Sequence, residues 1–108
     1  MQPHVALFPL NTVLFPGGVL PLRVFEARYM DMVRECMQRE AAFGVCLITR
    51  GGEVGQPAEH EEIGCLARIV DWDMAQLGLL QIRTIGAQRF RVLERRVRKD
   101  GLARADIQ

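Results

Sequence analysis

The pattern of apolar and polar positions divides the first forty residues into an extended part and a helical part. In residues 5–24 the apolar residues form short runs, which three prolines and the pair Gly17-Gly18 interrupt. Proline has no amide hydrogen and a fixed φ, so it is excluded from helix interiors and from central strands. The extended part is therefore predicted to contain strands at residues 5–8 and 19–24, a turn around residues 9–12 and a brief extended piece at residues 13–15.

The strand at residues 19–24 follows a turn and itself contains a proline. The sequence Pro16-Gly17-Gly18 is typical of a tight turn in which a glycine adopts a positive φ. Pro21 is compatible with the strand only if its nitrogen faces away from a ladder partner.

From residue 25 the apolar period becomes that of an α-helix. Apolar side chains fall at positions 25, 29, 32, 33, 36 and 37, which lie on one helix face. Acidic residues lie toward the start of this segment and Arg39 lies in its last turn, an arrangement that the helix dipole favours. We therefore expect a helix that begins within about three residues of Phe25 and ends near Glu40.

The rest of the chain has the pattern of short strands separated by glycine-marked turns. Phe90 and Val92 share one strand face whereas Val97 falls on the other, which predicts a β-bulge near Leu93-Glu94. Several short strands and one helix predict a mainly β (α+β), barrel-like domain. The predicted strands are residues 43–50, 63–72, 77–86, 89–97 and 102–107, with a polar connection at residues 51–62.

Composition and charge then limit the classes of protein that fit. A chain of 108 residues with 49% apolar and 25% charged residues is typical of one globular domain. A net charge of +1 gives no general attraction to nucleic acid or to an anionic membrane. The chain has neither a signal-peptide pattern nor the roughly 18 consecutive apolar residues of a membrane span. Three cysteines without a C-x-x-C pair favour a reducing cytoplasm, so we expect a cytoplasmic protein without a membrane partner.

The residues that could carry catalysis are few. No serine occurs in the chain, which excludes a serine-based triad, and the glycines of residues 51–55 lack the G-K-[ST] ending of a phosphate-binding loop. Cys36, Cys46 and Cys65 lie in apolar patterns and are predicted to be inert buried thiols, although a Cys–His pair stays formally open. His60 lies among glutamates without a second histidine or cysteine at ligand spacing. We therefore expect no catalytic residue, no metal site and no cofactor.

Residues 94–99, with the sequence ERRVRK, are the one basic run. On a strand these side chains alternate between two faces, and no aromatic residues are interleaved for base stacking. A solvated edge strand is therefore the interpretation, and we expect no nucleic-acid partner.

A second group of residues is apolar and placed at turns or off the predicted buried faces. A methionine-bearing surface can repack around apolar segments of another chain, and a contiguous exposed apolar patch marks an interaction site. The alternative is that these side chains complete the core. The candidate polypeptide-binding residues are Phe15, Met30, Trp72, Met74 and Leu77.

The opening sequence FPLNTVLFPGGVLPLRVFEARYMDMV, residues 8–33, resembles the start of the Lon protease N-terminal domain, also called the LON substrate-binding domain. The F-P-L, V-L-F-P-G, L-P-L and F-E-x-R-Y blocks match in order and spacing. The later sequences FGVCLI, GEVG, IGCLARI and GAQRFRVLE resemble later blocks, so the resemblance covers about residues 5–107. Two local departures are Cys65, where the family usually has threonine, and Gln76-Leu77-Gly78, which replaces an acidic residue and glycine.

The resemblance implies a PUA-like β pseudo-barrel of short, mostly antiparallel strands with one helix packed over it. It also implies a non-catalytic module that helps Lon proteases to recognise unfolded or damaged polypeptide and supports assembly, so the expected partner is such a polypeptide or a partner protein. A homo-oligomer is left open, and so are two alternatives: an RNA-binding PUA-like module and a purely structural or assembly domain. The chain stops inside an apparent strand, so we expect residues 1–108 to lack the family's C-terminal strand and helical segments.

Overall fold

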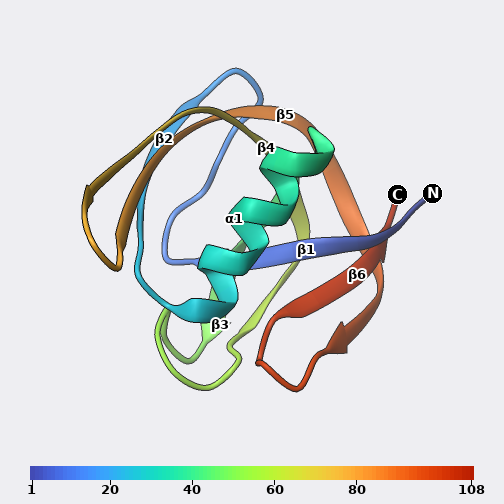
Figure 1. Cartoon of the computed structure of the whole chain (residues 1–108). Helices are drawn as coiled ribbons and strands as arrows, with labels where there is room; N and C mark the ends of the chain where they lie inside the picture. Colours follow the sequence, from blue (N-terminus) through green and yellow to red (C-terminus); the bar gives the residue numbers. More distant parts are fainter.

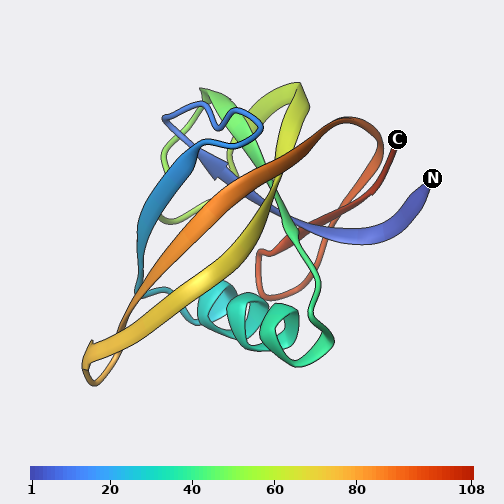
Figure 2. The same cartoon turned by 90° about the horizontal axis from the view of Figure 1, so that it is seen from above.

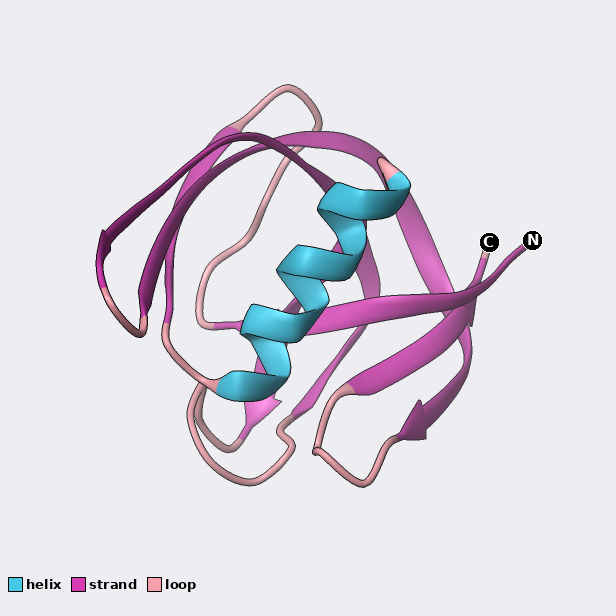
Figure 3. Ribbon diagram, in the orientation of Figure 1, coloured by secondary structure: helices cyan, strands magenta, loops and turns pink.

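The structure, a computed structural model, describes residues 1–108, which form six strands and one α-helix (Figure 1, Figure 3). The mainly β fold class predicted from the sequence is confirmed. In chain order the elements are β1 (Gln2–Leu10), β2 (Val19–Val24), α1 (Ala27–Arg39), β3 (Phe43–Arg50), β4 (Glu59–Gln76), β5 (Leu79–Val97) and β6 (Ala103–Ile107).

All six strands belong to one sheet that closes on itself. Their order is β2-β5-β4-β3-β1-β6, and an additional pairing of β5 with β6 closes the sheet into a pseudo-barrel. The long strand β5 makes this closure, because its first part pairs with β2 and β4 and its last part pairs with β6. Only β1 and β3 pair in parallel. The two chain ends lie side by side, since Gln2 is paired with Ile107 (Figure 1).

The helix lies across one face of the curled sheet, as Figure 2 shows from above. Its start and end agree with the prediction, but its buried stripe differs from the predicted one. Phe25 precedes the helix and is 56% exposed, and Met37 is 38% exposed. Because the helix begins two residues later than the apolar period suggests, its core face is made of residues 29, 32, 33 and 36, and Arg28 is buried beside them.

The core has two parts, one on each face of the central strands. The larger part lies against α1, where Phe8 stacks on Tyr29 with ring centroids 4.0 Å apart. Alternate residues of β1 belong to the two parts: Phe8 packs in the larger core and Leu7 in the smaller one. Strands that are buried on both faces have continuous apolar sequences, which explains the apolar runs in β1 and β3.

The ring of Phe90 fills the smaller core and occupies the space above two glycines. A β-carbon added to Gly44 would lie 2.6 Å from the ring, and one added to Gly64 would also lie 2.6 Å from it. The glycines of the FGV and IGC sequences therefore make room for Phe90.

The first predicted turn begins too early, because β1 runs from Gln2 through Pro9 to Leu10 and the chain bends only at Asn11 and Thr12. Pro9 is paired with Cys46 of β3, whereas β6 follows β1 only as far as Leu7, so at Pro9 one edge of β1 has no partner strand that requires an amide hydrogen. Residues 13–15 belong to the loop at residues 11–18 and form no strand.

The Pro-Gly turn agrees with the prediction. Gly17 has φ +80° and donates its amide hydrogen to the carbonyl oxygen of Gly86 at 2.8 Å. Strand β2 lies at the edge of the sheet and pairs with β5 alone, which accommodates Pro21.

Two other predicted strand limits are wrong. Strand β4 begins at Glu59, within the predicted polar connection, and β5 is continuous over the two segments predicted as separate strands. The start of β4 is extended by pairing with β3, and β5 is kept continuous by pairing with β4, which no local pattern shows. The predicted bulge is confirmed, since the register of β5 against β6 shifts between Val92 and Glu94.

Candidate functional site

The hairpin of β4 and β5 carries three of the five candidate residues. Trp72 is paired with Ile82, a buried core residue, but its own side chain is 53% exposed. Met74, two residues further along the strand, is 42% exposed, and Leu77 at the hairpin tip is 99% exposed. Near its tip the hairpin therefore extends beyond the core and leaves its apolar side chains in contact with solvent.

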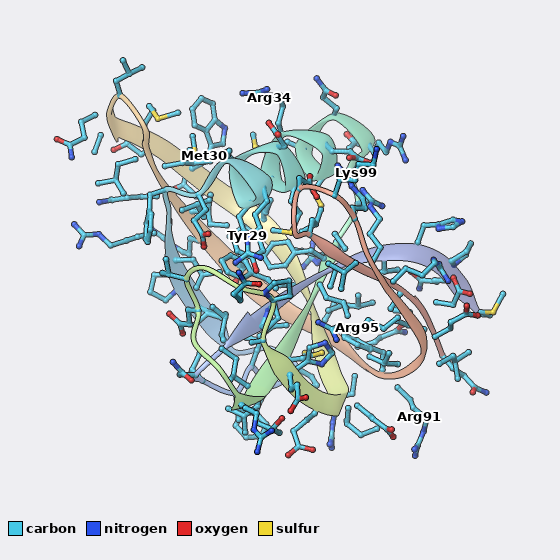
Figure 4. The ribbon with its side chains drawn as sticks, turned by 90° about the horizontal axis from the view of Figure 1, so that it is seen from below. Tyr29, Met30, Arg34, Arg91, Arg95 and Lys99 are labelled. Carbon is cyan, nitrogen blue, oxygen red and sulfur yellow. The ribbon has the colours of Figure 1, made fainter.

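The other two candidates differ from these three. Met30 is half-buried and packs against the larger core, and Figure 4 shows it between α1 and the hairpin. Phe15 is exposed, but its carbonyl contacts Gly86, which lies seven residues beyond the start of β5 at Leu79. At about 3.4 Å per residue this is roughly 24 Å from the hairpin tip. The five residues therefore do not form one patch, and Figure 2 shows the loop at residues 11–18 far from the hairpin tip.

A groove of about 790 Å³ lies beside the hairpin. Its walls are residues 2–6 of β1, residues 68–72 of β4 and the second half of α1 with the segment that follows it. We call it the β1–β4 groove. Met37, Val70 and Trp72 are its exposed apolar residues. Trp72 thus belongs to both the hairpin surface and the groove.

Sequence reasoning found Trp72 but missed the other groove residues. Val70 is the extra residue of a bulge in β4, between Ile69 and Asp71, so strand alternation does not indicate its direction. Met37 was assigned to the buried helix face. The groove lies where β3 stops pairing with β1 and β4. A single sequence contains no local signal for the point at which strand pairing ends.

The charges around the β1–β4 groove balance. Arg39 and Arg104 both contact Glu35, at 3.5 Å and 3.0 Å. The remaining charged residues of the lining are Arg68, Glu40 and Asp71, so three arginines face three carboxylates. The groove therefore has no net attraction for a polyanion or a polycation.

One end of the groove is fixed by a strained residue and an ion pair. His4 has φ 59°, which is unusual for a residue other than glycine, and its amide donates to Asp106 at 3.3 Å. Arg96 donates to the same carboxylate at 2.9 Å and to His4 Nδ1 at 3.2 Å. The hydrogen bond from Arg96 holds the pKa of Asp106 below its usual value. This network keeps the N-terminal strand in place beside β6.

The arginine of the FEARY sequence is structural. The Arg28 side chain is only 6% exposed, and it donates to the Gly101 carbonyl at 2.9 Å. It also lies 3.4 Å from the Glu26 carboxylate and 4.6 Å from the Tyr29 ring centroid. Arg28 therefore connects the start of α1 to the loop between β5 and β6, a role that its helical position did not indicate. The Tyr29 side chain beside Arg28 is itself buried, and this burial raises the pKa of its hydroxyl.

The thiols are buried, as predicted. Burial raises the pKa of Cys36 to about 11 and that of Cys46 to about 12, so both are protonated at neutral pH and are poor nucleophiles.

His60 has its Nδ1 2.9 Å from the Glu61 carbonyl oxygen, and burial lowers its pKa. No three His, Cys, Asp or Glu side chains are grouped to hold a metal ion. The single helix is too short and too polar to cross a membrane.

The basic run is largely occupied by internal contacts. Arg96 pairs with Asp106, Arg98 pairs with Asp100 at 2.9 Å, and Arg95 donates to the Ala58 carbonyl at 3.0 Å. Figure 4 shows that Arg95 and Lys99, two residues of the run, lie apart. No continuous basic surface results from this run.

These features define a class: a mainly β pseudo-barrel domain with one packed helix, a groove that exposes apolar side chains and no assembled catalytic constellation. A family model described as "ATP-dependent protease La (LON) substrate-binding domain" matches residues 4–108. The chain belongs to this family, as its opening sequence predicted.

Relatives and solved structures agree with this assignment. Protein cereblon from Gallus gallus is 31% identical over 98% of the chain, and its Danio rerio counterpart is 30% identical over 98%. The chain spans only 22% and 24% of their lengths. The Lon N-terminal domain protein from Xanthomonas campestris is 42% identical over 96% of the chain and 57% of that protein, with a TM-score of 0.82. The N-terminal domain of Mycobacterium avium complex Lon protease, at 12% identity, shows the same fold over 96% of the chain and 53% of its own, with a TM-score of 0.70.

Proposed function

We propose that this chain is a non-catalytic module that binds exposed apolar segments of unfolded polypeptide or of a partner protein. The family is that of a substrate-binding domain, and this supports the proposal. The observation that carries it is Trp72, a large apolar side chain that stays 53% exposed in the wall of the β1–β4 groove.

The chemistry of the exposed residues suits this function. Tryptophan provides a large contact area with few torsions to restrict, and methionine adapts to irregular surfaces. Trp72, Met74 and Met37 bring both residue types to the groove and the hairpin. The balanced charge of the groove and the internal pairing of the basic run favour an apolar ligand over RNA.

Binding to labelled casein and to labelled single-stranded RNA, each measured by fluorescence anisotropy at low and high salt, tests the proposal. We expect casein to bind with an affinity that changes little with salt, because the contact is apolar. RNA binding that falls steeply with salt, together with no casein binding, would overturn the proposal. The same protein should neither hydrolyse ATP nor cleave casein.

A further inference from the structure

Strand β3 is shorter than the space between its two neighbours. It pairs with β1 only from Leu7 to Leu10, and its pairing with β4 reaches no further than Ala67. Strand β1 nevertheless extends back to Gln2, and β4 continues to Gln76. Residues 2–6 of β1 and residues 68–76 of β4 therefore each have an edge with no partner strand.

The β1–β4 groove occupies the space where β3 would continue. Its lining includes residues 2–6 and 68–72 from the two free edges and residues 40–42, which descend from α1 to the start of β3. Residues 68–72 span roughly 14 Å of strand, enough for about five residues of an added strand. Met37 of α1 lies over this space and Trp72 lines its wall.

The free edges of the sheet differ in how they are protected. The outer edge of β2 contains Pro21, and the free edge of β1 contains Pro3 and the left-handed residue His4. Proline and bulges are common devices that prevent pairing at a sheet edge. Residues 68–76 of β4 contain a bulge at Val70 but no proline and no left-handed residue, and they make no backbone hydrogen bond outside the strand ladders. Of the two free edges that face the groove, that of β4 is therefore the one whose residues all have an amide hydrogen to donate.

We propose that an extended polypeptide segment pairs with β4 along residues 68–72 and continues the line of β3. The β4 backbone supplies hydrogen-bond donors and acceptors, and Met37, Val70 and Trp72 contact alternate apolar side chains of the segment. Because Met37, Val70 and Trp72 are the large exposed apolar side chains of the groove and its charges balance, the matching occupant is an apolar segment without net charge. This inference rests on the proposed function and specifies the mode of binding.

A pair of peptides separates strand pairing from simple apolar contact. The first is a fluorescein-labelled seven-residue peptide of alternating valine and threonine, and the second has the same sequence with every amide nitrogen methylated. Methylation removes the donors and leaves the side chains unchanged, so we expect at least tenfold weaker binding of the second peptide. Hydrogen exchange of the wild-type protein should show protection of residues 68–72 with the first peptide and no change in β2.

Two variants and one control locate the site. Trp72→Ala and Val70→Asp should each weaken binding of the unmethylated peptide and of casein about tenfold. Val54→Ala, which removes a more exposed apolar side chain outside both the groove and the hairpin, should leave both affinities within twofold. Urea midpoints close to that of the wild type show that the variants fold.

The outcomes distinguish this inference from the proposed function. If casein binds but methylation and the groove variants have no effect, strand pairing on β4 is overturned and the function stands. If neither peptide nor casein binds, both are overturned. A dimer in sedimentation that Val70→Asp dissociates, without peptide binding, would assign the β4 edge to a second copy of the chain and overturn the inference.

Discussion

The fit of Phe90 against two glycines gives a stability prediction with an internal control. The three atoms nearest to a β-carbon on Gly44 would all belong to side chains, with the Phe90 ring at 2.6 Å and Leu7 Cδ2 at 2.9 Å. A β-carbon on Gly64 would meet the same ring at 2.6 Å but also the Val45 carbonyl oxygen at 2.5 Å. Shrinking Phe90 can therefore relieve the first clash, whereas the backbone obstructs the second.

The magnitudes follow from packing. Overpacking a filled core costs about 1–3 kcal/mol, of which about 0.5–1 is offset because glycine disfavours a strand interior. We expect Gly44→Ala and Gly64→Ala to lower the free energy of unfolding by about 1 kcal/mol or more. Phe90→Leu alone should cost about 1–1.5 kcal/mol. In the double variant of Gly44→Ala with Phe90→Leu, the loss of unfolding free energy should then be about 1 kcal/mol smaller than the sum of the two single losses.

The assay is equilibrium urea unfolding followed by circular dichroism, with the m-value compared between variants. For a domain of this size, 1 kcal/mol corresponds to a shift of about 4–8 °C in Tm, so thermal unfolding gives a second measurement. Gly64→Ala combined with Phe90→Leu should be additive within about 0.5 kcal/mol. Equal rescue at both glycines, or additivity at both, would refute the argument that the obstructing atoms differ.

Three further predictions concern other parts of the fold. Gly17→Val should destabilise the protein by about 1–2 kcal/mol in urea unfolding, because a side chain at φ +80° is strained; an unchanged midpoint would contradict this. Arg28→Ala should cost about 2–3 kcal/mol in the same assay, because the Gly101 carbonyl loses a charged donor; a loss below 0.5 kcal/mol would show that the contact is dispensable. Arg96 depresses the pKa of Asp106, so the stability from this pair is present above the unfolded pKa of about 4 and is lost as pH falls through the folded pKa. Asp106→Asn should therefore flatten the acid limb of a plot of urea midpoint against pH, and an unchanged limb would assign that limb to other groups.

Local chemistry made some elements predictable. The 3.6-residue period predicted α1, and prolines and glycines predicted the limits of β2, because each of these signals acts on neighbouring residues. The burial of Arg28 was not predictable in this way. Its partner Gly101 is 73 residues away, and a charged residue is normally placed on the outer face of a helix.

The candidate site shows the same limit. Trp72 and Leu77 were found because they flank a hairpin tip, and both are exposed. Phe15 was grouped with them because it is apolar and lies beside a turn, but the length of β5 separates it from the hairpin. The β1–β4 groove depends on where β3 stops pairing with its neighbours, which is set by the path of the chain from α1 and by no residue type in the strands.

The pairing of β1 with β6 has a consequence for synthesis of the chain. Val5 is paired with Ala105, so a ribosome that adds about 5–20 residues per second completes the partner of β1 roughly 5–20 seconds after β1 itself. Ala103, Ala105 and Ile107 belong to the smaller core, and until they emerge the apolar residues Val5 and Leu7 lack this cover. The nascent N-terminus is then itself an exposed apolar segment of the kind that we propose the finished domain binds. The yield of folded protein should therefore depend more on translation speed and on access to chaperones than on the stability of the finished domain.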